Sequence, residues 1–145
     1  MARFRTFYMD DALFNLAEVI EAAQEALADV EFDTIVGTGF SGGIVVPALA
    51  LAMGKKFVLI RKEHDDSHHG GGRLLGELGA RWIFVDDLVS SGHTRDRVIR
   101  KVEDAAEEAS AITEMVGQYM YAGRPNEDGN LVFEAAPDMY AGYRR

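Results

Sequence analysis

Two adjacent carboxylates and a hydroxyl-rich turn are the residues of this chain best suited to chemistry. Asp86 and Asp87 follow the apolar run Ile83-Phe84-Val85, and after Leu88-Val89 comes Ser90-Ser91-Gly92-His93-Thr94. Unpaired backbone N–H groups at the start of a following helix would make this turn an anion site. Glycine would let the backbone approach the anion closely. The pattern suits a phosphate monoester on the turn and a sugar diol on the carboxylates, held directly or through a metal ion.

A glycine-rich segment, Gly37-Thr38-Gly39-Phe40-Ser41-Gly42-Gly43, follows another predicted strand and is a second candidate for ligand binding. Its glycines at 37, 39 and 42 match the spacing of dinucleotide-binding turns. The acidic residue that such proteins carry on the next strand is missing, because that strand ends in Arg61-Lys62. The segment also lacks the Gly-Lys-Ser/Thr ending of a nucleotide-triphosphate loop. We therefore expect a ligand-binding turn of neither class.

A polar, glycine-rich segment from His64 to Gly72 follows the basic pair Arg61-Lys62. Its composition predicts a mobile loop. The loop holds three histidines, but their spacing differs from that of structural zinc sites and the chain has no cysteine. We expect no preformed metal site there.

Helices and strands alternate along the chain around these candidate residues. Apolar side chains at steps of three and four predict amphipathic helices over Leu13–Leu27 and Arg95–Ala109. The nearly wholly apolar stretch Ile44–Met53 predicts a buried helix, with Pro47 in its first turn. Short apolar runs predict strands over Phe32–Val36, Lys56–Arg61, Leu74–Leu78, Arg81–Val85 and Ile112–Tyr121.

This order of elements predicts an α/β domain with a mostly parallel central sheet. In such sheets ligands bind beyond the carboxyl ends of the strands. The turns at Gly37–Gly43 and Asp86–Thr94 both follow predicted strands, so we expect them to share that edge.

Composition bounds the class of protein further. The chain has 145 residues, of which 48% are hydrophobic and 27% charged, as in a single globular domain. The net charge of −9 argues against nucleic acid as the main partner. The absence of cysteine fits a reducing compartment. Without a signal peptide or a run of about 18 apolar residues, we expect a cytoplasmic protein without membrane contact.

The segment from Ile83 to Thr94 resembles the phosphoribosyl-diphosphate signature of type I phosphoribosyltransferases. That signature is an apolar strand, two acidic residues, two variable positions and then Thr/Ser-x-Gly-x-Thr. One departure is His93, where a small residue or arginine is more usual. Family members use the backbone N–H at that position, so we expect the departure to be harmless. The family pattern covers about Asp33 to Tyr121.

The resemblance implies roles for individual residues. Asp86 and Asp87 would be catalytic residues that contact the ribose hydroxyls. The turn that would hold the 5′-phosphate is Ser90, Ser91, Gly92, His93 and Thr94. The diphosphate loop of the family is matched by the glycine-rich segment, with contacts expected at Thr38, Gly39, Ser41 and Gly42. Arg61 and Lys62 would reach the diphosphate. The loop between residues 62 and 73 would close over the site, with Lys62, His68, His69 and Arg73 as candidate contacts.

The resemblance also implies a fold and an activity. The fold is a single three-layer α/β domain over residues 1–145, with its core at about 33–121 and a small hood or interface from 1–10 and 122–145. The activity is transfer of the 5-phosphoribosyl group from phosphoribosyl diphosphate to a nitrogenous base. Magnesium is the expected cofactor, held by substrate oxygens and by Asp86 and Asp87 rather than by a protein cage. A homodimer is expected. A non-catalytic module that senses phosphoribosyl diphosphate is the alternative.

Overall fold

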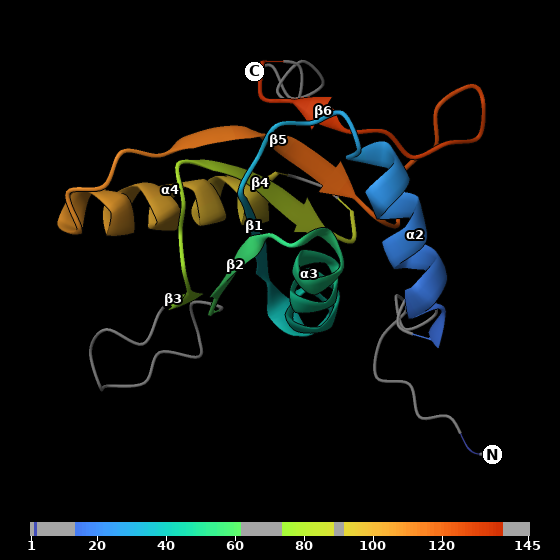
Figure 1. Cartoon of the computed structure of the whole chain (residues 1–145), viewed down its shortest axis with the longest axis horizontal. Helices are drawn as coiled ribbons and strands as arrows, with labels where there is room; N and C mark the ends of the chain where they lie inside the picture. The colour runs from blue at the N-terminus through green and yellow to red at the C-terminus, as the bar shows by residue number, and fades with distance from the viewer. Residues whose placement is uncertain (1, 3–13, 62–73, 89–91, 138–145) are drawn as a thin grey trace.

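The apolar runs of the sequence form the strands of a single sheet (Figure 1). The chain is seen in a computed structural model that describes residues 2, 14–61, 74–88 and 92–137. The sheet has six strands in the order β3-β2-β1-β4-β5-β6. Their bounds are β1 Thr34–Thr38, β2 Lys56–Ile60, β3 Leu74–Gly76, β4 Arg81–Asp86, β5 Glu114–Met120 and β6 Glu134–Ala135. The four inner strands are parallel, and the edge strands β3 and β6 pair antiparallel with their neighbours.

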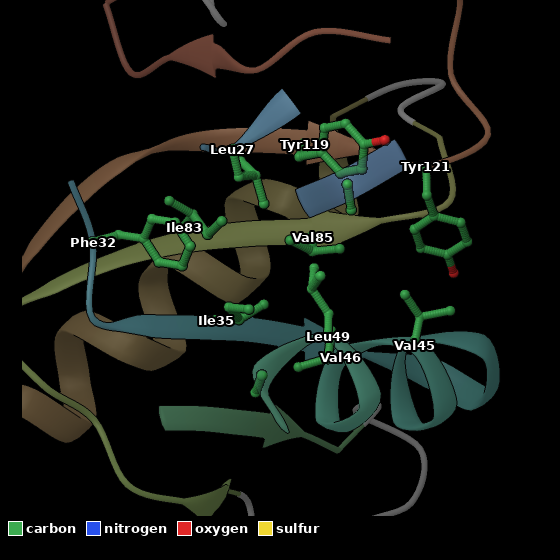
Figure 2. Packing of buried hydrophobic residues seen from close by; sticks show 12 residues of the cluster. Leu27, Phe32, Ile35, Val45, Val46, Leu49, Ile83, Val85, Tyr119 and Tyr121 are labelled. Atoms are coloured by element: carbon green, nitrogen blue, oxygen red, sulfur yellow. The ribbon is translucent and has the colours of Figure 1, made fainter. Parts of the chain in front are cut away.

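Helices cover both faces of the sheet and give the three layers that the family resemblance implies. On one face, α2 (Leu16–Ala26) and α3 (Gly39–Met53) pack against side chains such as Ile35 and Ile83 (Figure 2). On the other face, α4 (His93–Glu108) packs against side chains such as Trp82. The strands alternate their side chains between these two apolar layers, which explains why β1 and β4 are buried along almost their whole length.

The predicted strands are all present, with ends shifted by one or two residues, but the glycine-rich turn differs from its prediction. Gly37 and Thr38 complete β1, and α3 begins at Gly39 instead of Ile44. The prediction that Pro47 lies in the first turn of this helix is therefore wrong, because Pro47 lies in the helix interior. Pro47 has no N–H to donate to the carbonyl of Gly43. The helix nevertheless continues through Pro47. Packing of this apolar helix therefore stabilises it more than the missing hydrogen bond destabilises it.

One strand was not predicted at all. β6 is only two residues long, so it carries no readable alternation of polar and apolar side chains. It pairs with β5 through Gly117 and Ala135. A Cβ at Gly117 would lie 2.2 Å from the carbonyl oxygen of Glu134, so glycine permits this close approach.

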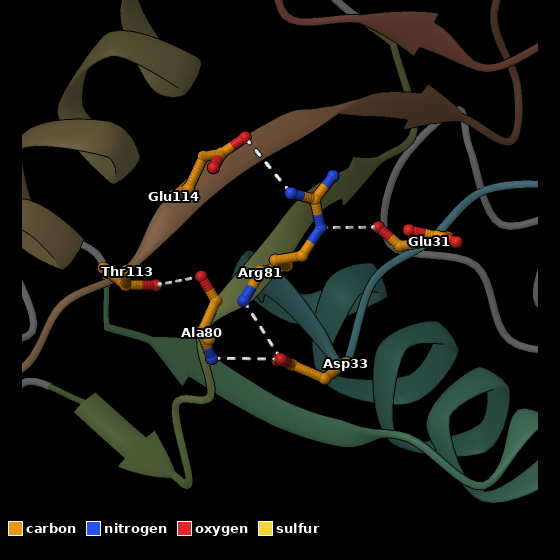
Figure 3. Close-up of polar contacts among 6 residues, drawn as sticks. All are labelled: Glu31, Asp33, Ala80, Arg81, Thr113 and Glu114. Carbon is orange, nitrogen blue, oxygen red and sulfur yellow. Dashed lines mark hydrogen bonds and ion pairs between the residues drawn. The ribbon is translucent and has the colours of Figure 1, made fainter.

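The amino ends of the central strands are joined by one carboxylate (Figure 3). Asp33 Oδ2 accepts hydrogen bonds of 3.0 Å from the backbone N–H groups of both Ala80 and Arg81, and Asp33 Oδ1 accepts one of 2.6 Å from the Thr34 hydroxyl. Burial raises the pKa of Asp33, but these hydrogen bonds and the charge of Lys56 together hold it below its usual value. At the amino ends of these strands, the polar groups of Asp33, Thr34, Ala80 and Arg81 are bonded to one another. The candidate ligand-binding turns lie at the carboxyl ends of the strands.

Within the described residues, no helix is both long and apolar enough to cross a membrane.

Candidate active site

The candidate site lies where the connections leave two neighbouring strands in opposite directions. From β1 the chain passes through α3 to β2 on one side, and from β4 it passes through α4 to β5 on the other. The pairing of β1 with β4 runs from Thr34↔Trp82 to Val36↔Phe84. Beyond the last pair the two strands have no further ladder contacts. In open α/β sheets this switch point is where a crevice forms and ligands bind.

Asp86 and Asp87 stand at the carboxyl end of β4, beside this switch point. Asp86 is the last residue of the strand and is 9% exposed, while Asp87 is half-buried. Their backbone carbonyls accept hydrogen bonds of 3.0 Å from Tyr121 N–H and 2.9 Å from Ala122 N–H. Asp87 Oδ1 accepts a further bond of 2.6 Å from the N–H of Leu88. The end of β5 therefore holds the backbone that carries both carboxylates.

The turn after these carboxylates leads directly into α4. Gly92 precedes the helix with φ of 84°, a left-handed conformation that favours glycine. His93 and Thr94 are the first residues of α4, and their N–H groups belong to the helical turn that lacks intrahelical acceptors. The predicted phosphate contacts Ser90 and Ser91 lie outside the described residues. The described part of the turn has the exposed helix start that an anion site requires.

The glycine-rich segment supplies the start of the other helix. Gly39 has φ of 80° and begins α3, and Ser41 and Gly42 in its first turn are buried. Thr38 uses its hydroxyl to donate a 2.7 Å hydrogen bond to the carbonyl of Ile60, which fastens the end of β1 to β2. At Gly37 an added Cβ would lie 2.5 Å from Val46 Cγ2, so the absence of a side chain lets α3 pack close to β1.

The basic pair predicted to reach the diphosphate begins just after β2. Arg61 is exposed, and its backbone carbonyl accepts a 3.2 Å hydrogen bond from Lys101 of α4. The other predicted basic contact, Lys62, and the loop candidates His68, His69 and Arg73 lie outside the described residues. The described part of the chain thus brings Thr38, Gly39, Ser41, Gly42, Arg61, Asp86, Asp87, Gly92, His93 and Thr94 to one edge of the sheet.

Tyr121 connects the start of α3 to the chain that follows β5, although the sequence predicted it only as the last residue of a strand. It follows β5, and its hydroxyl donates a 2.8 Å hydrogen bond to Ser41 Oγ. Figure 2 shows the Tyr121 ring beside Val45, with the hydroxyl directed toward α3. Burial raises the pKa of Tyr121, and the carboxylates of Asp87 and Asp86 raise it further. The sequence could have pointed to Tyr121 as a site residue only through its position. Tyr121 ends a predicted strand, and the carboxyl end of that strand lies on the same side of the sheet as the candidate site.

The arrangement can bind an anionic, hydroxyl-rich ligand. Two helix starts and two carboxylates follow the carboxyl ends of β1 and β4, an arrangement that suits a molecule with negative groups near a diol. Among the described residues, no group of three or more histidine, cysteine, aspartate or glutamate side chains could hold a metal ion. A divalent ion here would need ligands from the bound molecule as well as from Asp86 and Asp87.

Two curated relatives cover most of the chain. Adenine phosphoribosyltransferase of Solibacter usitatus (strain Ellin6076) is 30% identical over 131 residues, which are 79% of this chain and 75% of the relative. Orotate phosphoribosyltransferase of Archaeoglobus fulgidus is 31% identical over 116 residues, which are 75% of this chain and 65% of the relative. No protein-family model matches the chain.

Solved structures agree with the sequence relatives. Adenine phosphoribosyltransferase from Rhodothermus marinus DSM 4252 superposes with a TM-score of 0.52 at 27% identity, covering 71% of this chain and 64% of that one. Orotate phosphoribosyltransferase from Aeropyrum pernix has a TM-score of 0.57 at 16% identity over 78% of this chain and 63% of that one, and this likeness concerns the fold. Given the identity and coverage of the first relative and the shared fold, the chain belongs to the type I phosphoribosyltransferase family.

Proposed function

We propose that this protein transfers the 5-phosphoribosyl group from phosphoribosyl diphosphate to a nitrogenous base, giving a nucleoside 5′-monophosphate and diphosphate. The observation that supports this most directly is the placement of Asp86 and Asp87 at the switch point, between the starts of α3 and α4. Relatives named for adenine and for orotate phosphoribosyl transfer fit the same reaction class.

Each part of the substrate has a group suited to it. The 5′-phosphate would lie on the turn at the start of α4, where Gly92, His93 and Thr94 offer backbone N–H groups. The ribose hydroxyls would bind Asp86 and Asp87. The diphosphate would lie on Gly39, Ser41 and Gly42 at the start of α3, with Arg61 beside it.

The reaction breaks the bond between C1 of the ribose and the diphosphate oxygen and forms a bond between C1 and a nitrogen of the base. A positive charge develops on the sugar in the transition state, and negative charge develops on the leaving group. The carboxylates near the ribose and the N–H groups near the diphosphate would stabilise these charges, and the fixed geometry would hold the reacting atoms together.

Magnesium fits this site through the chemistry of its donors. Asp86 and Asp87 supply hard oxygen ligands, which Mg²⁺ prefers, and diphosphate supplies more. When bound, the ion would neutralise charge on the diphosphate. The protein's part would be to place the two carboxylates beside the sugar, through the backbone bonds from Tyr121 and Ala122.

A panel of bases tests the activity. The protein would be mixed with phosphoribosyl diphosphate, Mg²⁺ and one base at a time, with adenine and orotate included, and release of diphosphate would be measured. Release with one base supports the transferase. Tight binding of phosphoribosyl diphosphate without turnover of any base would favour the sensing module instead, and failure to bind it at all would overturn both.

We also propose a homodimer and a cytoplasmic location. Support for the dimer comes from α3, where Phe40, Ile44 and Leu51 are 71%, 38% and 86% exposed. Their spacing places them on one side of the helix, as in a surface that packs against another protein. The chain contains no cysteine, which suits a reducing compartment.

A further inference from the structure

The hydrogen bond between Tyr121 and Ser41 connects two segments that are 80 residues apart in the sequence. Ser41 lies in the first turn of α3, and Tyr121 lies just beyond the end of β5. Both side chains are buried, at 7% and 5% exposure. The bond is therefore shielded from water and fixes the rotamers of both residues.

The direction of this bond decides what Ser41 can do. A hydroxyl group has one O–H to donate and two lone pairs that accept. When Tyr121 donates to the Ser41 oxygen, the Ser41 hydrogen remains available for another acceptor.

We propose that Tyr121 is a positioning residue, which turns the Ser41 hydroxyl into a donor aimed at the diphosphate of the substrate. This inference rests on the proposed function, because it assigns a ligand to the start of α3. It goes beyond that function in naming a residue outside the family signature and in giving it one task. Tyr121 acts through Ser41 and makes no contact with the reacting atoms.

If Tyr121 only stabilised the fold, its loss would weaken the binding of every part of the substrate and not of the diphosphate alone. Its ring packs in the apolar layer on the α2 and α3 side of the sheet, where loss of the whole side chain would disturb the fold. Replacement by phenylalanine keeps the ring and removes only the hydroxyl. The binding of separate parts of the substrate then shows whether the effect is local to the diphosphate.

The test compares Tyr121→Phe, Ser41→Ala and the double variant by calorimetric titration with three probes. These are phosphoribosyl diphosphate and inorganic diphosphate, each with Mg²⁺, and ribose 5-phosphate. We expect Ser41→Ala to weaken binding of both diphosphate probes by about tenfold or more, and Tyr121→Phe by about two- to tenfold. The double variant should bind no more weakly than Ser41→Ala alone, because both changes remove one coupled interaction. Ribose 5-phosphate affinity should not change.

Tyr119→Phe is the matched control. Tyr119 lies on β5 and is 1% exposed, and its hydroxyl has no hydrogen-bond partner among the described residues. This variant removes the same atom from a tyrosine two residues earlier in the chain and should leave diphosphate affinity unchanged.

Three results would overturn the inference. They are unchanged diphosphate binding in Tyr121→Phe, an equal loss of diphosphate and ribose 5-phosphate binding, and additive losses in the double variant. If Tyr121→Phe does not fold, unchanged diphosphate binding in Ser41→Ala decides against it. Failure of the unmodified protein to bind phosphoribosyl diphosphate would instead refute the proposed function itself.

Discussion

At the scale of single residues, the two neighbouring carboxylates are held differently. Asp86 is nearly buried at the end of β4, whereas Asp87 is more open and accepts a hydrogen bond from the next backbone N–H. Both carbonyls of the pair are bonded to the chain that follows β5. The backbone is thus fixed before any ligand arrives, which reduces the ordering that binding must cause.

The double variant Asp86→Asn with Asp87→Asn tests the ribose assignment. We expect phosphoribosyl diphosphate to bind at least about 100-fold more weakly, because two charged hydrogen-bond acceptors are lost. The fold should persist, since asparagine has the same shape and the backbone bonds do not involve the side chains. Titration calorimetry and circular dichroism measure the two effects. Asp104→Asn, on the exposed side of α4, is the control. Undiminished affinity in the double variant would refute the assignment.

At the scale of elements, polar contacts join the amino ends of the central strands. Asp33 joins the start of β1 to the segment before β4, and Gly79 lies so close that an added Cβ would be 2.2 Å from Asp33 Oδ1. Thr34 completes the contact by accepting a 2.9 Å bond from the N–H of Gly79. These bonds fix the position of β1 relative to β4 along the strand direction. They therefore also fix where the carboxyl ends of the two strands lie relative to each other.

Asp33→Asn should lower the free energy of unfolding by about 1–3 kcal/mol at pH 7, because an ionised acceptor of several hydrogen bonds is replaced by a neutral one. The pKa of Asp33 is lower in the folded chain than in the unfolded chain. The ionised carboxylate therefore stabilises the fold at pH values above about 4, and this contribution is lost as the pH falls further.

Urea unfolding, followed by the fluorescence of the single tryptophan Trp82, measures this effect at pH 7 and pH 3. The difference between the unmodified protein and Asp33→Asn should shrink in acid. Asp29→Asn, at an exposed position before β1, should match the unmodified protein at both values. A difference that stays the same in acid would show that the charge of Asp33 does not contribute.

At the scale of the whole molecule, α3 has two apolar sides. One side packs on the sheet through Val45, Val46 and Leu49, which are fully buried. The other carries Phe40, Ile44 and Leu51 in contact with solvent. An apolar strip on the surface of a helix that also begins at the candidate site is typical of a protein contact surface.

Leu51→Asp should weaken the proposed homodimer by about tenfold or more, because a charge would be buried in the contact. The fold of one subunit should not change, since Leu51 is 86% exposed. Sedimentation velocity over a range of concentrations measures the association. Ile112→Asp is the control, because Ile112 is 95% exposed and lies before β5, outside α3. An unmodified protein that is monomeric at all concentrations, or a Leu51→Asp variant that still dimerises, would contradict this surface.

Much of the fold followed from local patterns. The parallel strands β1, β2, β4 and β5 were predicted from short apolar runs, and the helices from their spacing of apolar residues. The patterns failed where packing overrides local preference. Pro47 lies inside α3 although it normally ends a helix, and β6 forms from two residues with no pattern of their own.

The sequence by itself determined the kind of site, because Asp86, Asp87 and the turn before α4 are neighbours in the chain and their order carries the chemistry. Only the tertiary structure decided that Tyr121 bonds to Ser41 and that Asp33 bonds to the backbone N–H groups of Ala80 and Arg81 at the start of β4. These contacts join segments far apart in the chain. They depend on strand order and register, which set distances between atoms that no local pattern of residues specifies.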